Sequence, residues 1–177
     1  SPVDVGIFNI MMKIATPIAF ILIAFQRSSM PRIAKKYAEG DLEYLKHAFL
    51  KIGLLAGALG LFFFLLVLFF GQNILLIWKI DEYEVYKSLI ILAFGFLINA
   101  ATSVAGPILA MTGQEDIHSK INVISVALQI TLSFILTVEF GIIGAAMSFT
   151  FIMLFSNLAK VYFMYKKVLS RPNIMKE

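Results

Sequence analysis

The sequence has 177 residues, 60% of them hydrophobic and only 15% charged, with a mean hydropathy of +0.88. Soluble domains average about 25% charged residues, so the composition excludes a water-soluble globule and predicts an integral membrane protein. Cysteine is absent and the two histidines are far apart, so no metal site or cofactor is expected, and a net charge of +4 in so apolar a chain indicates anionic lipid and not nucleic acid as its partner.

Five apolar segments are long enough to cross a bilayer, which requires about 20 helical residues. We therefore expect an all-α, polytopic membrane helical bundle with transmembrane helices at about residues 5–26, 48–70, 87–111, 118–138 and 142–165. Gly40 followed by Asp41 predicts the end of one helix and the N-cap of the next. Three further turn signals are expected to mark helix boundaries: Gly71-Gln72-Asn73, Thr112-Gly113-Gln114 and Phe140-Gly141.

Within the first predicted helix, Asn9, Lys13 and Thr16 share one face immediately before Pro17. Lys13 can extend its aliphatic stem to the outer headgroups, or it can serve as a fixed cation in a cavity that binds an anionic ligand. Its polar neighbours favour the second interpretation, because a lysine that reaches the headgroups needs no polar companions. Pro17 and the later Pro107 are either simple kinks or sites that free backbone carbonyls beside a transport path.

The segment from Met30 to Tyr37 is expected to continue the first helix as a basic extension at the membrane surface. In the second predicted helix, Gly53 and Gly57 are one turn apart with almost no polar atoms nearby. Small residues at this spacing allow two helix backbones to approach closely. This helix is therefore expected to pack tightly against a neighbour or to face lipid.

Polar residues recur at helical spacing in the last three predicted helices. The third has Asn99 and Ser103 one turn apart, with Pro107 after another turn. The fourth carries the longest stripe, which consists of Asn122, Ser125, Gln129, Ser133 and Thr137. The fifth places three polar residues near one face, with Asn157 beside them: Ser148, Ser156 and Lys160. Such groups face a bundle interior or a wet cavity, and for the longest stripe interhelical bonding and cavity lining remain equally open.

The distribution of basic residues predicts the orientation of the chain. Lysine and arginine are concentrated in the first loop and in the C-terminal segment, where Lys160, Lys166, Lys167, Arg171 and Lys176 occur. The positive-inside rule places both segments in the cytoplasm, so Ser1 is expected on the outer side of the cell membrane and Glu177 on its cytoplasmic side. Because the chain opens without methionine, it is also expected to be a piece of a longer protein.

No enzyme motif is found: the sequence has no glycine-rich phosphate loop, no His-Glu-x-x-His and no Gly-x-Ser-x-Gly. The chain is therefore not expected to be an enzyme. Apart from Glu139 at the outer margin, no carboxylate lies within the predicted helices. A proton relay or an organic-cation site requires such a group, so neither is favoured.

Several short motifs, in their order and spacing, are similar to those of a known family. They are Val5-Gly6-Ile7-Phe8-Asn9 with Lys13, Pro31-Arg32-Ile33-Ala34, Gly40-Asp41, Phe70-Gly71-Gln72-Asn73-Ile74-Leu75, Asn99-Ala100, Gly106-Pro107-Ile108-Leu109-Ala110-Met111-Thr112-Gly113 and Gly141-Ile142-Ile143-Gly144-Ala145-Ala146. Together they resemble the polysaccharide-biosynthesis or oligosaccharide (Wzx-type) flippase family of the multidrug, oligosaccharidyl-lipid and polysaccharide exporter superfamily.

This resemblance implies a fold of two six-helix lobes, of which residues 1–177 are helices eight to twelve: a partial C-terminal lobe whose first helix is missing. It implies transfer of a lipid-linked oligosaccharide, a polyprenyl-pyrophosphate glycan, across the cytoplasmic membrane for the synthesis of cell-surface polysaccharide or lipopolysaccharide. The expected partners are this substrate, membrane lipids and the N-terminal lobe.

Lys13 occupies a position where the family often has arginine or lysine, so the resemblance implies that it neutralises pyrophosphate. Together with the residues placed by helical spacing, it gives the predicted substrate-binding set: Lys13, Asn9, Thr16, Asn99, Ser103, Asn122 and Gln129. The alternative function is a multidrug or organic-cation antiporter of the same superfamily, which the lysine and the shortage of buried carboxylates disfavour.

Overall fold

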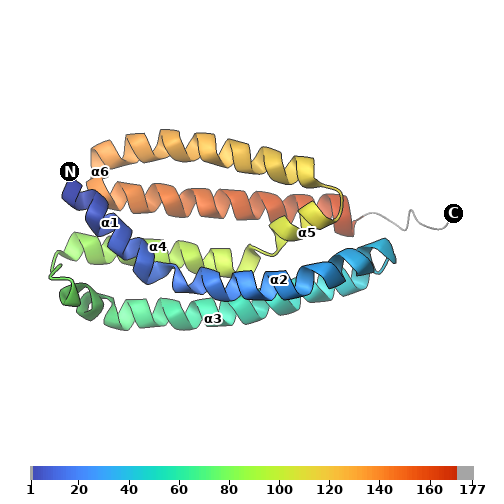
Figure 1. Ribbon diagram of the computed structural model, residues 1–177. Helices are drawn as coiled ribbons and strands as arrows, with labels where there is room; N and C mark the ends of the chain where they lie inside the picture. The colour runs from blue at the N-terminus through green and yellow to red at the C-terminus, as the bar shows by residue number, and fades with distance from the viewer. Residues whose placement is uncertain (1, 171–177) are drawn as a thin grey trace.

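The computed structural model describes residues 2–170, with the side chains of residues 18–28 excepted. Every regular element in that part of the chain is helical. The elements are α1 (Pro2–Ala15), α2 (Pro17–Ala38), α3 (Leu42–Ile77), α4 (Tyr83–Thr102), α5 (Ala105–Met111), α6 (Glu115–Met164) and the π-helical turn η1 (Tyr165–Leu169). They form long rods that lie side by side in alternating directions (Figure 1). The predicted all-α bundle is confirmed.

Two of the rods consist of two helices each, because a proline interrupts the backbone hydrogen bonds. Pro17 has no N–H to donate to the carbonyl of Lys13, and α1 ends two residues earlier, at Ala15. The hydroxyl of Thr16 donates to the carbonyl of Met12 at this break. Pro107 likewise cannot donate to Ser103, which lies between α4 and α5. Both prolines therefore accompany breaks in the rods.

Helix α6 is a hairpin of two antiparallel arms, residues 115–140 and 142–164, that meet at Gly141 (Figure 1). Gly141 has φ 57° and ψ −133°, a backbone conformation that residues with a Cβ rarely adopt. The predicted boundary at Phe140-Gly141 is therefore confirmed. The turn brings the second arm back along the first.

Three described stretches are long and apolar enough to span a membrane: Leu42–Ile77, Tyr83–Met111 and Glu115–Leu169. The predicted span at residues 5–26 lies partly outside the residues whose side chains are described. Large apolar side chains are exposed on the outer faces of the rods, among them Leu54 at 75%, Phe69 at 73% and Phe134 at 73%. Such surface is unfavourable in water and favourable in lipid. The chain is a multi-pass membrane protein.

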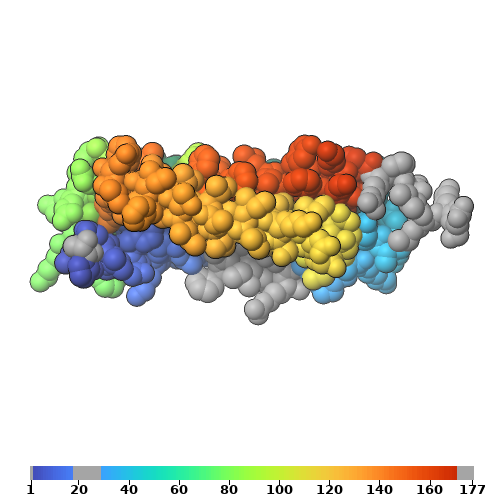
Figure 2. All heavy atoms as spheres, turned by 90° about the horizontal axis from the view of Figure 1, so that it is seen from above, coloured from blue at the N-terminus to red at the C-terminus, as the bar shows by residue number. Residues whose placement is uncertain are grey.

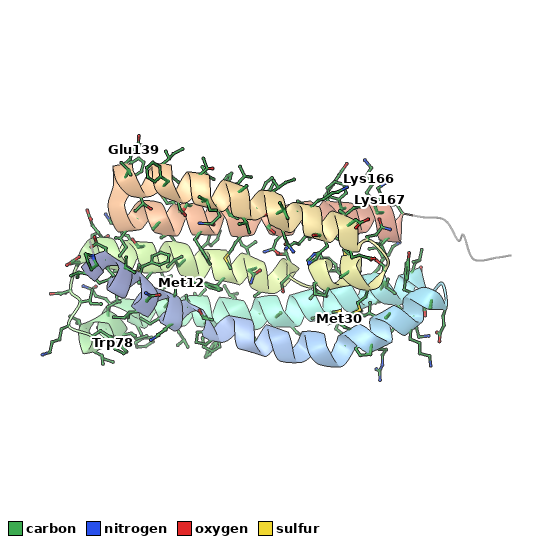
Figure 3. All side chains as sticks on the ribbon, turned by 45° about the horizontal axis from the view of Figure 1, so that its top comes forward. Met12, Met30, Trp78, Glu139, Lys166 and Lys167 are labelled. Carbon is green, nitrogen blue, oxygen red and sulfur yellow. The ribbon has the colours of Figure 1, made fainter. Side chains whose placement is uncertain are left out.

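The two ends of the bundle differ in charge. Figure 3 shows Lys166 and Lys167 at one end, with Glu139 and Trp78 at the other. The loop that joins α2 to α3 lies at the lysine end, together with η1 (Figure 1). The structure thus brings together the two segments that the sequence marks as basic, although Arg171 and Lys176 lie outside the described residues.

The boundary predicted at Gly71-Gln72-Asn73 is wrong. Helix α3 continues through these residues to Ile77, and the chain then turns at Lys79, which has φ 59°. A Cβ on Gly71 would lie 3.2 Å from the ring of Tyr86 on α4. This glycine therefore serves close helix packing, and it does not end the helix.

Gly53 and Gly57 also serve helix packing, as predicted. A Cβ on Gly53 would lie 2.7 Å from the carbonyl oxygen of Ala101, and one on Gly57 would lie 3.3 Å from the Cβ of Ala101. Since Ala101 belongs to α4, these two glycines let α3 and α4 approach closely. The expectation that this helix packs tightly against a neighbour is confirmed.

Gly40 and Asp41 end α2 and begin α3, as predicted. Gly40 has φ 76°, and Oδ1 of Asp41 accepts a 3.0 Å hydrogen bond from the N–H of Tyr44. Nζ of Lys36 lies 3.4 Å from Oδ2 of Asp41. The bond from Tyr44, assisted by Lys36, holds the pKa of Asp41 below its ordinary value of 3.8.

Asp41→Asn is expected to remove part of the acid sensitivity of the protein. Because the folded pKa of Asp41 is lowered, the charged cap stabilises the fold above pH 3.8 and is lost as the pH falls through the lowered value. Asparagine keeps a capping oxygen without the charge. Thermal unfolding in detergent, followed by circular dichroism between about pH 5 and 2, should show a smaller drop for the variant. An identical drop in both proteins would contradict this role.

Candidate functional site

The polar stripe on the first arm of α6 faces the second arm. Figure 2 looks onto this first arm, which runs along one face of the bundle. Gln129 Nε2 donates to Ser133 Oγ at 2.6 Å, and Ser133 Oγ lies 3.0 Å from Ser148 Oγ on the second arm. Part of the stripe therefore forms the interhelical bonds that the sequence left open.

Another part of the stripe lines a hollow of about 200 Å³ between α4 and the two arms of α6. Its lining is mixed: five of the residues are amides or hydroxyls, one is a lysine and three are apolar. They are Asn99, Ser125, Gln129, Phe149, Ile152, Met153, Ser156, Asn157 and Lys160. We call this space the α4–α6 hollow. It is an open hollow in which six polar side chains lie beside three apolar ones.

Two amides from distant parts of the chain fix one wall of the α4–α6 hollow. Nδ2 of Asn157 donates a 2.9 Å hydrogen bond to Oδ1 of Asn99, which is 58 residues earlier. Asn157 is only 5% exposed, so this bond satisfies a buried polar group. It holds α4 against the second arm of α6 and sets the position of both amides.

His118 and Lys160 converge over α5 beside the α4–α6 hollow. A Cβ on Gly106 of α5 would lie 2.9 Å from Cε1 of His118 and 3.4 Å from Cδ of Lys160. Nε2 of His118 lies 3.2 Å from Nδ2 of Asn122. Only because residue 106 is glycine can the imidazole and the lysine stem both approach α5 so closely.

The structure divides the predicted substrate-binding set. Asn99 and Gln129 share the α4–α6 hollow, whereas Asn122 is not among its described lining residues and instead contacts His118. Ser103 lies at the break between α4 and α5, and Thr16 at the break between α1 and α2. Asn9 lines a second hollow of about 360 Å³, formed by α1 and the α6 turn, with Asp4 and Thr137 among its lining residues.

Lys13 is an exposed side chain on α1. It is not among the described residues that line either of these two hollows. The cation that does line the α4–α6 hollow is Lys160, which belongs both to the polar face of the fifth predicted helix and to the basic C-terminal segment. Its spacing from Ser156 and Asn157, four and three residues, indicates that shared face in the sequence, although the predicted substrate-binding set does not include Lys160.

Comparison with known proteins gives one family and one curated relative. The sequence pattern of the MatE family matches residues 1–135. The chain is also 27% identical over 168 residues to the capsular polysaccharide biosynthesis protein CapF of Staphylococcus aureus, and the match covers 89% of this chain and 41% of that protein. The chain thus spans about two fifths of the length of this curated relative. No solved structure gives a significant match.

Proposed function

Since the chain belongs to the MatE family, we propose that it forms one part of a membrane exporter that moves a lipid-linked oligosaccharide, a polyprenyl-pyrophosphate glycan, across the cell membrane for cell-surface polysaccharide synthesis. Family membership supports transport, and the relative from Staphylococcus aureus, which acts in capsular polysaccharide biosynthesis, supports a glycan as the cargo. The α4–α6 hollow is the structural observation that carries the proposal.

Sugar hydroxyls need hydrogen-bond partners while they are out of water, and the α4–α6 hollow offers them. Asn99, Gln129 and Asn157 supply amide donors and acceptors, and Ser125 and Ser156 supply hydroxyls. At about 200 Å³ the hollow is smaller than a typical small-molecule site of about 300–1,000 Å³. It therefore suits one part of a larger substrate, with the rest held by a second lobe.

The proposed mechanism is rocking of two lobes about a hydrated cavity that opens to one side of the membrane at a time. The sugar and the pyrophosphate would then avoid hydrocarbon while the lipid tail stays in the bilayer. The lysine-rich end of the bundle is proposed to be cytoplasmic, because basic residues are retained on that side. A cationic role for Lys13 stays a prediction, and it would require the second lobe to enclose this exposed residue.

Gln129→Leu tests the proposal. We expect glycan export to fall about fivefold, the effect of losing one neutral hydrogen bond worth about 1 kcal/mol to the substrate. The readout is surface polysaccharide in cells whose own exporter gene is deleted and replaced by the variant, at matched protein level.

Thr131→Val is the matched control. Thr131 is exposed on the same arm, two residues from Gln129, and its hydroxyl donates to the carbonyl of Ala127. This variant should export glycan normally. If the unaltered protein restores no polysaccharide and instead confers resistance to cationic drugs, the glycan assignment is wrong.

A further inference from the structure

Two buried polar atoms beside the α4–α6 hollow have no hydrogen-bond partner within the described part of the chain: Oγ of Ser125 and Nδ1 of His118. Most buried polar side-chain atoms in native structures are hydrogen-bonded, and each exception requires an explanation. Ser125 and Lys160 line the hollow. His118 is not among its described lining residues, but its ring and the stem of Lys160 approach the same glycine, Gly106 of α5. Lys160 therefore connects the two unpartnered atoms, because it shares the hollow with Ser125 and approaches the same glycine as His118.

Around Lys160, the α4–α6 hollow has a positive charge and no negative one among its described lining residues. Lys160 is only partly exposed and forms no ion pair with any described residue, and no carboxylate is among the described residues that line the hollow. An ammonium group carries three donors and no acceptor. If Nε2 of His118 accepts from the amide of Asn122, then Nδ1 carries the proton and is a further donor. The group that would satisfy these atoms is an acceptor with negative charge.

We propose that Lys160 and His118, with Ser125, form a subsite for a phosphoryl group at one end of the α4–α6 hollow. This inference rests on the proposed function, because it assigns the phosphate of a lipid-linked substrate to this end and its sugar to the amides of Asn99, Gln129 and Asn157. A phosphoryl group offers several acceptor oxygens and a charge that compensates for a lysine removed from water. A neutral sugar would supply no such charge.

The glycine on α5 is part of the subsite. Because a Cβ on Gly106 would meet the imidazole of His118 at 2.9 Å, Gly106→Ala should displace the ring from Lys160. The variant changes no charge and no hydrogen-bonding group. It therefore tests the convergence of the two side chains separately from their chemistry.

The experiment measures binding of farnesyl pyrophosphate, inorganic pyrophosphate and farnesol to the complete protein that carries this sequence, purified in detergent. We expect Lys160→Met to weaken farnesyl pyrophosphate binding about tenfold or more, as for the loss of one charge-assisted hydrogen bond. Lys160→Arg should restore most of the binding, and Gly106→Ala should weaken it. Lys166→Met is the matched control, because Lys166 is an exposed lysine six residues further on that donates to the hydroxyl of Tyr162.

The subsite is supported if the unaltered protein binds farnesyl pyrophosphate but not farnesol. It also requires that Lys160→Met weakens this binding and that Lys166→Met does not. Comparable binding of inorganic pyrophosphate would identify a soluble anion as its source, and binding only of the prenylated form would identify a lipid-linked one. Equal binding by the unaltered protein and Lys160→Met would overturn the subsite. If the two proteins bind equally while Gln129→Leu still impairs glycan export, the proposed function stands and the subsite is wrong. If binding depends on Lys160 but the unaltered protein exports no glycan, the subsite stands and the proposed function is refuted.

Discussion

Gly144→Ala is expected to destabilise the protein strongly, because the added methyl group would overlap the other arm of α6. A Cβ on Gly144 would overlap the backbone carbonyl oxygen of Leu136, on the opposite arm of the hairpin. A side chain could rotate away, but a backbone carbonyl cannot move without displacing its helix. We expect a loss of about 3 kcal/mol or more in the free energy of unfolding, at the upper end of what overpacking costs. The measurement is thermal unfolding in detergent.

Gly6→Ala provides the control for this effect. Gly6 is also helical, in α1, but a Cβ there would meet nothing within 4 Å. Alanine has the better helix propensity, so this variant should be as stable as the original protein or slightly more stable. If Gly144→Ala unfolds at the same temperature as Gly6→Ala, the two arms are not packed as closely as the structure has them.

The second large effect concerns the Asn99–Asn157 pair. Asn157→Leu removes the donor to Oδ1 of Asn99 and leaves that oxygen without its interhelical partner. Hydrogen bonds between membrane helices contribute about 0.6 kcal/mol on average and up to about 1.7 kcal/mol. Glycan export should fall by more than the amount of folded protein falls, because both amides also line the α4–α6 hollow.

A double-mutant cycle with Asn99→Leu separates the two roles. The unfolding energies of the single and double variants should be non-additive by about 0.6 to 1.7 kcal/mol, since the second change removes a group already unpaired. Export should remain low in the double variant, because leucine restores packing but offers the substrate no hydrogen bond. Additive unfolding energies, or normal export by the double variant, would show that the pair does not act as described.

The differences between prediction and structure have a common physical cause. The turn at Gly40-Asp41 and the reversal at Gly141 follow from local backbone chemistry, so the sequence predicts both. Gly71 carries the same local signal, but its role depends on Tyr86 of another helix, and α3 therefore continues where a stop is predicted. A glycine needed for a turn and a glycine needed for close packing look alike until the neighbouring helix is known.

The candidate site shows the same limit. Helical spacing identifies which residues share a face of one helix, and it places Gln129 on a polar stripe. It does not give the rotation of that helix relative to its neighbours, so it cannot tell that Ser133 meets Ser148 while Gln129 shares a hollow with Lys160. Lys13 and Lys160 are both lysines near polar neighbours, and only the folded chain distinguishes the exposed one from the one that lines the α4–α6 hollow.

The sequence by itself determines a helical membrane bundle. Apolar length, turn residues and the positions of charges are properties of single segments, and they decide whether each segment enters the bilayer as a helix. The tertiary structure decides which polar groups meet. The turn at Gly141 folds the second arm of α6 onto the first, and close packing then joins Asn99 to Asn157 across 58 residues. Contacts between residues so far apart depend on the relative rotation of whole helices, which no local pattern specifies.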